Sequence, residues 1–121
     1  MAFNNSFLYK RIKGVGYAFK GAFILLKNEA SIQVQAFIAI VVTIAGFYFE
    51  ISTTEWLIQI LTIALVMGLE GANSAIEEIA DFIHPEHHTK IGFIKDIAAG
   101  AVFFTAIAAV IIACIIYIPK F

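Results

Sequence analysis

The sequence contains little cysteine, little proline and little charge. Its single cysteine, Cys114, cannot form a disulfide within the chain and lies in an apolar run, where it is expected to act as a small apolar side chain. With only two prolines and 14% charged residues, long stretches have no helix breaker and no ionised side chain. Hydrophobic residues make up 61% of the chain and its mean hydropathy is +0.91, whereas an ordinary soluble domain is only about half apolar. The composition therefore predicts a small integral membrane protein.

Several familiar sequence signals are absent as well. The N-terminus lacks the apolar core of about 7–15 residues that precedes the cleavage site of a signal peptide, so the spans themselves are expected to direct insertion. No P-loop pattern occurs, and Gly14 with Gly16 is only a weak glycine signal. The net charge of −1 gives no information about partners, and no nucleic acid is expected to bind. A nucleotide would have to bind without the common soluble frameworks.

Three apolar segments are long enough to cross a hydrocarbon core about 30 Å thick, which takes about 20 helical residues. We expect spans at about residues 29–49, 54–83 and 96–118. Residues 97–118, IAAGAVFFTAIAAVIIACIIYI, contain no charged side chain and are the clearest of the three. The sequence therefore predicts three transmembrane helices.

The N-terminal segment has a different composition. Residues 5–27 mix aromatic and apolar residues with Lys and Arg, which is typical of an amphipathic helix lying in the membrane interface. Gly14, Gly16 and Gly21 disfavour a helix, and the alternative is a basic tail that only orients the spans. The expected fold class is an all-α membrane protein, with a surface helix and three transmembrane helices in one domain over residues 1–121.

Positive charge predicts which side of the membrane each segment faces. Five of the eight basic residues precede the first long apolar run: Lys10, Arg11, Lys13, Lys20 and Lys27. The loop EISTTE between the first two spans has neither Lys nor Arg, whereas HPEHHTKIGFIKD between the last two carries Lys90 and Lys95. Because short cytoplasmic segments collect positive charge, the N-terminus and second loop are expected in the cytoplasm and the C-terminus outside, with Lys120 as a small counter-signal.

The second span ends in carboxylates that share one face. Glu70, Asn73 and Glu77 are spaced i, i+3 and i+7, which places them within about 60° of each other on a helix. Glu70 lies about 21 Å from the outer end of its span, near the inner limit of the hydrocarbon, where a carboxylate is costly unless it faces protein, metal or water. The alternative is that the apolar span stops near Leu69 and a solvated helix follows. Ala72, Ala75, Ile76 and other apolar residues beyond Glu70 favour the first interpretation.

The predicted topology gathers further polar residues on the same side. Glu29 opens the first span, and Lys95 with Asp96 opens the third. Magnesium prefers one or two carboxylates together with the oxygens of a bound phosphate, and a nearby lysine can neutralise phosphate charge. The pattern therefore predicts a membrane-surface site for a magnesium nucleotide.

Three histidines, His84, His87 and His88, lie in the second loop and could indicate a zinc site. Their spacing matches no regular ligand pattern, so solvated loop side chains are the favoured interpretation.

These residues resemble one family, the prokaryotic diacylglycerol kinase family of small integral-membrane lipid kinases. The resemblance extends from about Lys10 to Pro119 and includes GYAFKG, NEAS, EGANSAIEEIAD, PEHH and KDIAAGAV. Its most specific element is the pattern E-x-x-N-[ST]-A-I-E, present from Glu70 to Glu77. The resemblance implies an enzyme that transfers the γ-phosphoryl group of MgATP to the hydroxyl of a membrane lipid. It also implies a homotrimer with shared active sites in the bacterial cytoplasmic (inner) membrane.

The resemblance also implies roles for individual residues. Glu70 would act as general base on the lipid hydroxyl, Glu29 and Glu77 would bind Mg²⁺, and Asn73 would support this polar site. The nucleotide side would comprise Lys10 or Arg11, Tyr17, Glu29, Glu77, Glu86, His87, His88, Lys95 and Asp96. The lipid side would comprise Val15, Phe19, Ser31, Gln35, Glu70 and Ala99.

Three positions depart from the family's usual pattern. Gly71 replaces one of the usual apolar residues between the glutamate and the asparagine, and it is expected to loosen the helix beside the proposed base. Gln33 and Gln35 stand where many relatives have charged or basic residues, which leaves the lipid preference open.

Diacylglycerol is the expected acceptor, because the N-terminal arm and NEA resemble diacylglycerol kinases. The alternative is undecaprenol, because PEHH and the IPKF ending occur in the shorter undecaprenol-type chains. Two alternatives lie outside this class: an oligomeric proton or cation pathway lined by Glu70 and Glu77, and a purely structural membrane subunit. A pathway would need polar residues across the bilayer, where the outer parts of spans one and three offer only Thr43 and Thr105.

Overall fold

The computed structural model describes residues 6–121, and those residues contain helices, turns and no β-strand. The helices are α1 (Phe7–Asn28), α2 (Ala30–Tyr48), α3 (Thr53–Ile83), α4 (Thr89–Tyr117) and the short 3₁₀ helix η2 (Ile118–Lys120). Three helices are long and apolar enough to cross a membrane, namely Ala30–Tyr48, Thr53–Ile83 and Thr89–Lys120. The predicted all-α fold class with three apolar spans is confirmed.

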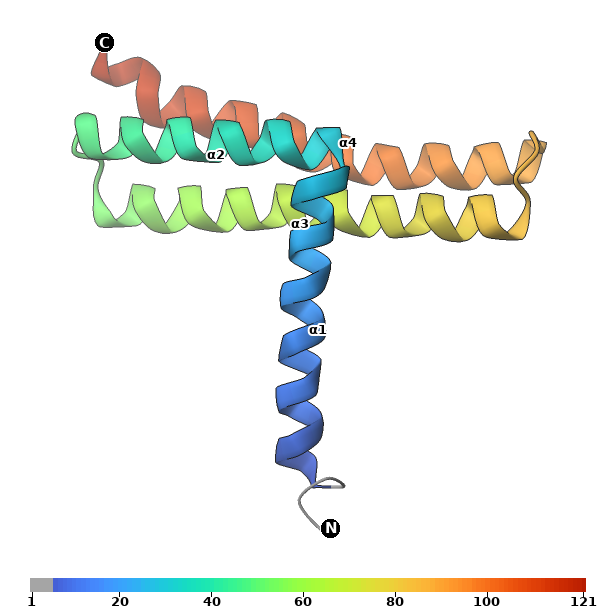
Figure 1. The fold of residues 1–121 in the computed structure, drawn as a ribbon. Helices are drawn as coiled ribbons and strands as arrows, with labels where there is room; N and C mark the ends of the chain where they lie inside the picture. Colours follow the sequence, from blue (N-terminus) through green and yellow to red (C-terminus); the bar gives the residue numbers. More distant parts are fainter. Residues whose placement is uncertain (1–5) are drawn as a thin grey trace.

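The three long apolar helices lie side by side with α3 in contact with both α2 and α4, and α1 runs crosswise to them (Figure 1). Few apolar side chains are buried in the described chain: Ile32, Ile51, Ala80, Ala98 and Ile116. Large side chains such as Phe37 and Phe104 are exposed on the outer faces of the spans. An apolar exterior of this kind suits lipid, which removes the need for a large internal core.

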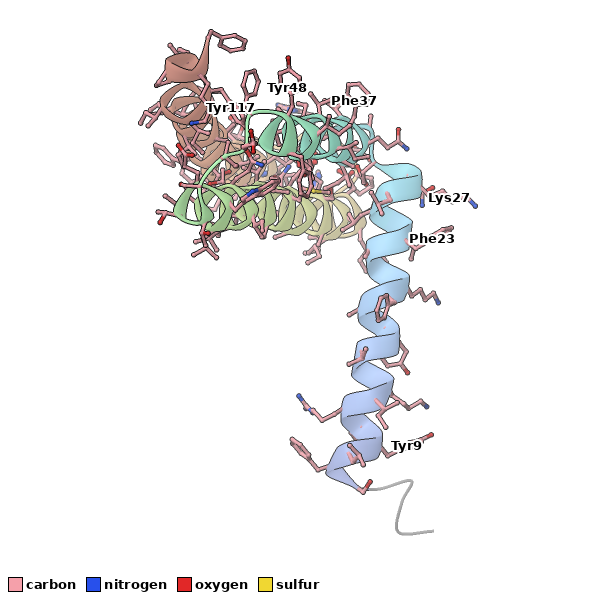
Figure 2. All side chains as sticks on the ribbon, turned by 90° about the vertical axis from the view of Figure 1, so that its left-hand side faces the viewer. Tyr9, Phe23, Lys27, Phe37, Tyr48 and Tyr117 are labelled. Atoms are coloured by element: carbon pink, nitrogen blue, oxygen red, sulfur yellow. The ribbon has the colours of Figure 1, made fainter. Side chains whose placement is uncertain are left out.

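α1 extends away from the other helices. Its N-terminus is capped by Ser6, whose side chain accepts a hydrogen bond from the backbone N–H of Tyr9 at 3.1 Å. No residue of α1 is buried, and its side chains, including Tyr9, Phe23 and Lys27, project on all sides (Figure 2). The glycines do not interrupt this helix, so the helix predicted for this segment is present. The predicted start at residue 5 lies outside the described residues.

Two short turns join the spans. Ser52 and Glu55 form a capping box at the start of α3, in which each side chain bonds the other's backbone N–H. At the other end of α3, His88 caps α4 by accepting a hydrogen bond from the N–H of Lys90 at 3.0 Å. α4 therefore begins at Thr89, well before the predicted span start near residue 96. Hydropathy detects only the apolar part of a helix, whereas the cap determines where the helix itself begins.

A polar network ties the three spans together at the end where α2 meets α3. Gln59 is 5% exposed and donates to the carbonyl of Val42 at 3.1 Å, while the Tyr117 hydroxyl donates to Gln59 Oε1 at 2.6 Å. Lys120 pairs with Glu55 across 3.4 Å, so the positive charge at the C-terminus is neutralised locally. These contacts hold α2, α3 and α4 together at this end of the bundle.

Candidate active site

The candidate site is centred on Glu70, midway along α3. Its Oε1 accepts a hydrogen bond from Nε2 of Gln35 on α2 at 3.1 Å. Its Oε2 lies 3.4 Å from Nδ2 of Asn73, one helical turn further along α3. Two amide groups from two helices therefore hold the carboxylate, which lies partly buried between them.

Asn73 also connects Glu70 to the second carboxylate of the stripe. Its Nδ2 lies 3.4 Å from Oε1 of Glu77 as well as from Glu70. The predicted shared face of Glu70, Asn73 and Glu77 is thus present as a continuous row of polar contacts. Two buried acceptors in this row, Gln35 Oε1 and Asn73 Oδ1, have no hydrogen-bond partner. Buried acceptors without a donor are costly, so these two oxygens destabilise the row as it stands.

The antiparallel register of α2 and α3 places Glu29 between the levels of Glu70 and Glu77. Val42 of α2 lies beside Gln59 of α3, because Gln59 Nε2 donates to the Val42 carbonyl at 3.1 Å. Glu29 lies 13 residues before Val42, whereas Glu70 and Glu77 lie 11 and 18 residues after Gln59, so Glu29 lies about 3 Å beyond Glu70 and about 7 Å short of Glu77 along the helix axis. Glu29 is the extended residue between α1 and α2, and its carboxylate makes no capping bond to α2. Its level is therefore closer to that of Glu70 than to that of Glu77.

Lys95 lies further along the same direction. Its Nζ contacts Asp81 Oδ1 at 2.6 Å, which joins α3 to α4 near the turn between them. Asp96 and Ala99, also predicted for the site, are exposed on α4. The sequence interpretation placed Lys95 beside nucleotide and did not identify Asp81 as its partner. The spacing offered a signal, since Asp81 follows Glu77 by one helical turn.

Three more of the predicted nucleotide-binding residues lie in the α3–α4 turn, where all are exposed: Glu86, His87 and His88. The backbone carbonyl of Glu86 lies 2.8 Å from Nδ1 of His84, and the His84 and His88 rings are in contact with centroids 5.0 Å apart. The structure thus assigns local roles in the turn to His84 and His88.

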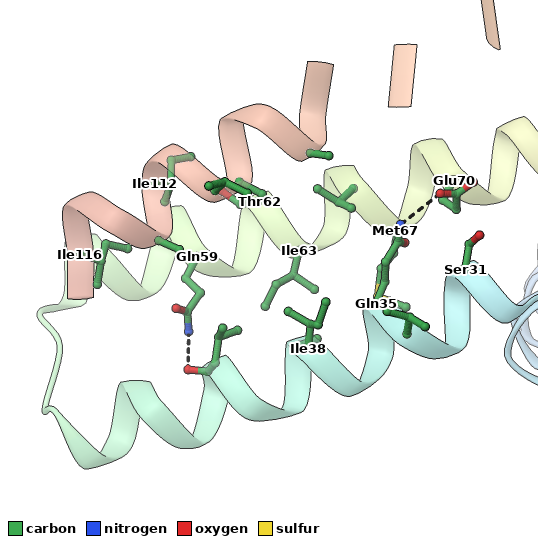
Figure 3. A pocket seen from close by; sticks show the side chains of 18 of the residues that line it. Ser31, Gln35, Ile38, Gln59, Thr62, Ile63, Met67, Glu70, Ile112 and Ile116 are labelled. Carbon is green, nitrogen blue, oxygen red and sulfur yellow. Dashed lines mark hydrogen bonds between the residues drawn. The ribbon is translucent and has the colours of Figure 1, made fainter. Parts of the chain in front are cut away.

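An apolar groove of about 650 Å³ runs from Glu70 towards the polar network, with walls from α2, α3 and α4. At its inner end it is lined by Ser31, Gln35 and Glu70, and at its far end by Gln59 and Ile116 (Figure 3). Several alanines of α2 and α4 line the groove, and their small side chains leave space between these helices and α3. Gln59 lies eleven residues from Glu70, which corresponds to about 16 Å along the helix axis.

Four predicted site residues do not join this arrangement within one chain. Lys10, Val15, Tyr17 and Phe19 lie on α1, where they are exposed; Phe19, for example, is 74% exposed. Arg11, the alternative to Lys10, stacks over Phe7 at 5.1 Å. Because α1 contacts the bundle only near its C-terminal end, these side chains project away from Glu70 (Figure 1).

The donor set fits magnesium held jointly with phosphate, and not a complete protein cage. No group of three or more His, Cys, Asp or Glu side chains that could hold a metal ion occurs among residues 6–121. Magnesium commonly takes only one or two protein carboxylates and completes its shell with water and phosphate oxygens. Glu29, before α2, and Glu77, on the polar face of α3, are two carboxylates outside the described ion pairs and would provide such a partial set.

Comparison with known proteins gives consistent results. A family model described as prokaryotic diacylglycerol kinase matches residues 16–117. The chain is 37% identical to an undecaprenol kinase of Bacillus subtilis (strain 168), over 93% of this chain and 92% of that protein. It is 32% identical to a diacylglycerol kinase of Escherichia coli (strain K12), over 96% and 95%. It is also 32% identical to a diacylglycerol kinase of Haemophilus influenzae (strain ATCC 51907 / DSM 11121 / KW20 / Rd), over 76% and 78%.

Proposed function

The chain belongs to the prokaryotic diacylglycerol kinase family and is a membrane lipid kinase, and from this premise we propose that it phosphorylates diacylglycerol with MgATP. The γ-phosphoryl group passes to the free hydroxyl of the lipid and gives phosphatidic acid. The observation that carries this proposal is the position of Glu70, whose carboxylate is held by two amides at the inner end of an apolar groove. An acceptor hydroxyl and an apolar chain can meet there.

Glu70 acts as the general base in this proposal. A lipid whose chain lies along the groove presents its hydroxyl to the carboxylate, which accepts the proton as the oxygen attacks phosphorus. The hydrogen bond from Gln35 and the contact with Asn73 orient the carboxylate. Ser31 and Gln35 line the same end of the groove and contact the lipid near its hydroxyl.

The nucleotide occupies the side of Glu70 that faces the α3–α4 turn. Glu29 and Glu77 hold magnesium, because both lie beyond Glu70 on the side of the α3–α4 turn and neither takes part in an ion pair described in the structure. Bound magnesium neutralises phosphate charge and aligns the transferred group. Lys95 and Asp96, with residues 86–88 of the turn, contact the nucleotide. Ala99 lies on α4 one helical turn after Lys95 and contacts the lipid there.

The site is completed by a neighbouring copy in a homotrimer. Lys10, Val15, Tyr17 and Phe19 lie along α1, which projects away from its own bundle, so they can reach the active site of another protomer. Small residues around Gly100 on α4 allow close approach of helices. The number three rests on the resemblance to the family.

The protein lies in a membrane, and we place it in the bacterial cytoplasmic membrane with its N-terminus and active site in the cytoplasm. The basic residues of α1, together with Lys90 and Lys95 in the first turns of α4, support this orientation. α1, crosswise to the spans, then lies along the membrane surface near the level of Glu70 (Figure 1).

Undecaprenol is the second candidate acceptor. The 37% identity to an undecaprenol kinase exceeds the 32% identity to the diacylglycerol kinases, and the groove bounded by α2, α3 and α4 is mostly apolar. A proton or cation pathway receives no such support, because the groove wall between Gln59 and Glu70 is mostly apolar.

The test is ATP-dependent phosphate incorporation by the purified protein in lipid micelles. Diacylglycerol and undecaprenol are offered separately and together, with and without Mg²⁺, and Glu70→Gln serves as the inactive control. Preferential labelling of diacylglycerol by the parent supports the proposal. Preferential labelling of undecaprenol supports the second candidate acceptor instead. If folded protein labels neither lipid, the proposed kinase activity is overturned.

A further inference from the structure

The junction between α1 and α2 is held by Gln33. Its Nε2 donates to the carbonyls of Leu26 and Lys27 at 3.1 and 3.0 Å. Those carbonyls belong to the last turn of α1, where backbone acceptors have no partner within the helix. Gln33 is in the first turn of α2, and its own N–H donates to the carbonyl of Glu29 at 3.0 Å. One side chain therefore joins the end of α1 to the start of α2 around Glu29.

Gly71 provides a second contact at this junction. A Cβ placed at Gly71 would lie 3.0 Å from Cδ1 of Leu25, so the last turn of α1 rests directly on the α3 backbone beside Glu70. The other α3 glycine, Gly68, would meet nothing within 4 Å. The two glycines therefore differ in this contact while sharing one helix and one backbone conformation.

Gln33 and Gly71 both contact the elbow, the junction at Glu29 where α1 meets α2. We propose that Gln33 and Gly71 are positioning residues that fix the angle of α1 and thereby hold Glu29 beside the polar row of Glu70, Asn73 and Glu77. The inference rests on the proposed function of Glu29 as a magnesium ligand. Glu29 is a single extended residue between two helices, so its height follows the elbow and cannot be set by a helix of its own.

The packing of α1 on α3 accounts for a glycine next to the proposed base. In an isolated helix a glycine is less favourable than alanine. Here Gly71 leaves room for Leu25, which packs α1 against α3 one residue from Glu70. The ends of α1 and α2 therefore meet α3 beside Glu70.

The first experiment compares Gly71→Val with Gly68→Val in detergent-solubilised protein. Mn²⁺, which takes the same oxygen ligands as Mg²⁺, is titrated by electron paramagnetic resonance with a non-hydrolysable ATP analogue. Gly71→Val is expected to weaken Mn²⁺ binding and raise the Mg²⁺ concentration for half-maximal activity, each by about tenfold, a change of about 1.4 kcal/mol. The KM for lipid stays within about twofold. Gly68→Val is expected to change none of these values.

Truncation of Leu25 supplies the rescue. Adding Leu25→Ala to Gly71→Val removes the side chain that the valine displaces and is expected to restore most of the Mn²⁺ affinity. Equal effects of Gly68→Val and Gly71→Val, or no restoration by Leu25→Ala in folded protein, would overturn the inference.

A second pair of variants tests Gln33 and covers the case in which Gly71→Val does not fold. Gln33→Glu keeps the shape but loses the donor, and it places a negative charge against two carbonyls. Gln33→Lys keeps a donor. Weak Mn²⁺ binding in Gln33→Glu with near-parental binding in Gln33→Lys supports the elbow, and parental binding in both contradicts it. Absence of lipid phosphorylation by the parent would instead count against the proposed function, since Mn²⁺ binding is measured without turnover.

Discussion

Gln35 of α2 and Glu70 of α3 are joined by a hydrogen bond of 3.1 Å at the inner end of the apolar groove. This bond links two antiparallel helices and orients the carboxylate that faces the groove. Its acceptor is the proposed base and not a proposed metal ligand, so the bond is expected to act on turnover.

Removal of the Gln35 donor is predicted to slow turnover without affecting metal binding. Gln35→Met has a similar length but cannot donate to Glu70. Hydrogen bonds to charged groups contribute about 1.5–3 kcal/mol, so kcat is expected to fall about 10- to 100-fold. Kinetics with saturating MgATP check this, with Phe37→Met, an exposed substitution on the same helix, as control. An unchanged kcat would show that the bond does not orient the base.

Glu70 and Glu77 are predicted to have separable roles. Glu70→Gln keeps the size of the side chain and one acceptor oxygen but cannot accept a proton, so kcat is expected to fall by a factor of about 10² to 10⁴. Nucleotide binding in the presence of Mg²⁺ stays close to that of the parent. Glu77→Gln is expected to weaken MgATP and Mn²⁺ binding instead. Calorimetric titration of both variants decides, and an equal loss of binding in the two would contradict this division.

The fold was predictable because its signals are local. Long apolar segments set the three spans, and the mixture of basic and aromatic residues between 5 and 27 indicated the surface helix. The early start of α4 at Thr89 was not predicted, because it depends on the side chain of His88 and not on hydropathy. Hydropathy predicts the membrane-spanning segment, whereas capping residues determine where the helix begins.

The site was only partly predictable from the sequence. Helical spacing correctly placed Glu70, Asn73 and Glu77 on one face, since spacing alone determines a shared face. The contacts of Gln35 with Glu70 and of Gln33 with α1 depend on the register and the elbow between helices, which no local pattern encodes. Gly71 was expected to loosen the helix. In the structure, the absence of a side chain at Gly71 leaves room for the side chain of Leu25.

Lys95 is predicted to act on nucleotide binding more than on stability. Its ion pair with Asp81 involves side chains that are 37% and 57% exposed, and such pairs contribute only about 0–1 kcal/mol. Lys95→Met is therefore expected to change the unfolding free energy by less than about 1 kcal/mol. Loss of a charge beside the phosphates raises the KM for MgATP by about tenfold or more. Lys90→Met, in the first turn of the same helix, is the control, and a similar KM change there would indicate a general charge effect.

The network at the far end of the groove is predicted to stabilise the fold without contributing to catalysis. Tyr117→Phe removes the hydroxyl that donates to Gln59 at 2.6 Å and leaves a buried acceptor with one partner fewer. Loss of a buried hydrogen-bond partner costs about 1–3 kcal/mol, so the midpoint of unfolding in mixed micelles is expected to fall. Tyr48→Phe, whose ring is 78% exposed, should leave the midpoint unchanged. Mg²⁺ dependence should remain parental in both variants, because the network lies about 16 Å from Glu70 along α3. An altered Mg²⁺ dependence in Tyr117→Phe would mean that the two ends of the groove are coupled.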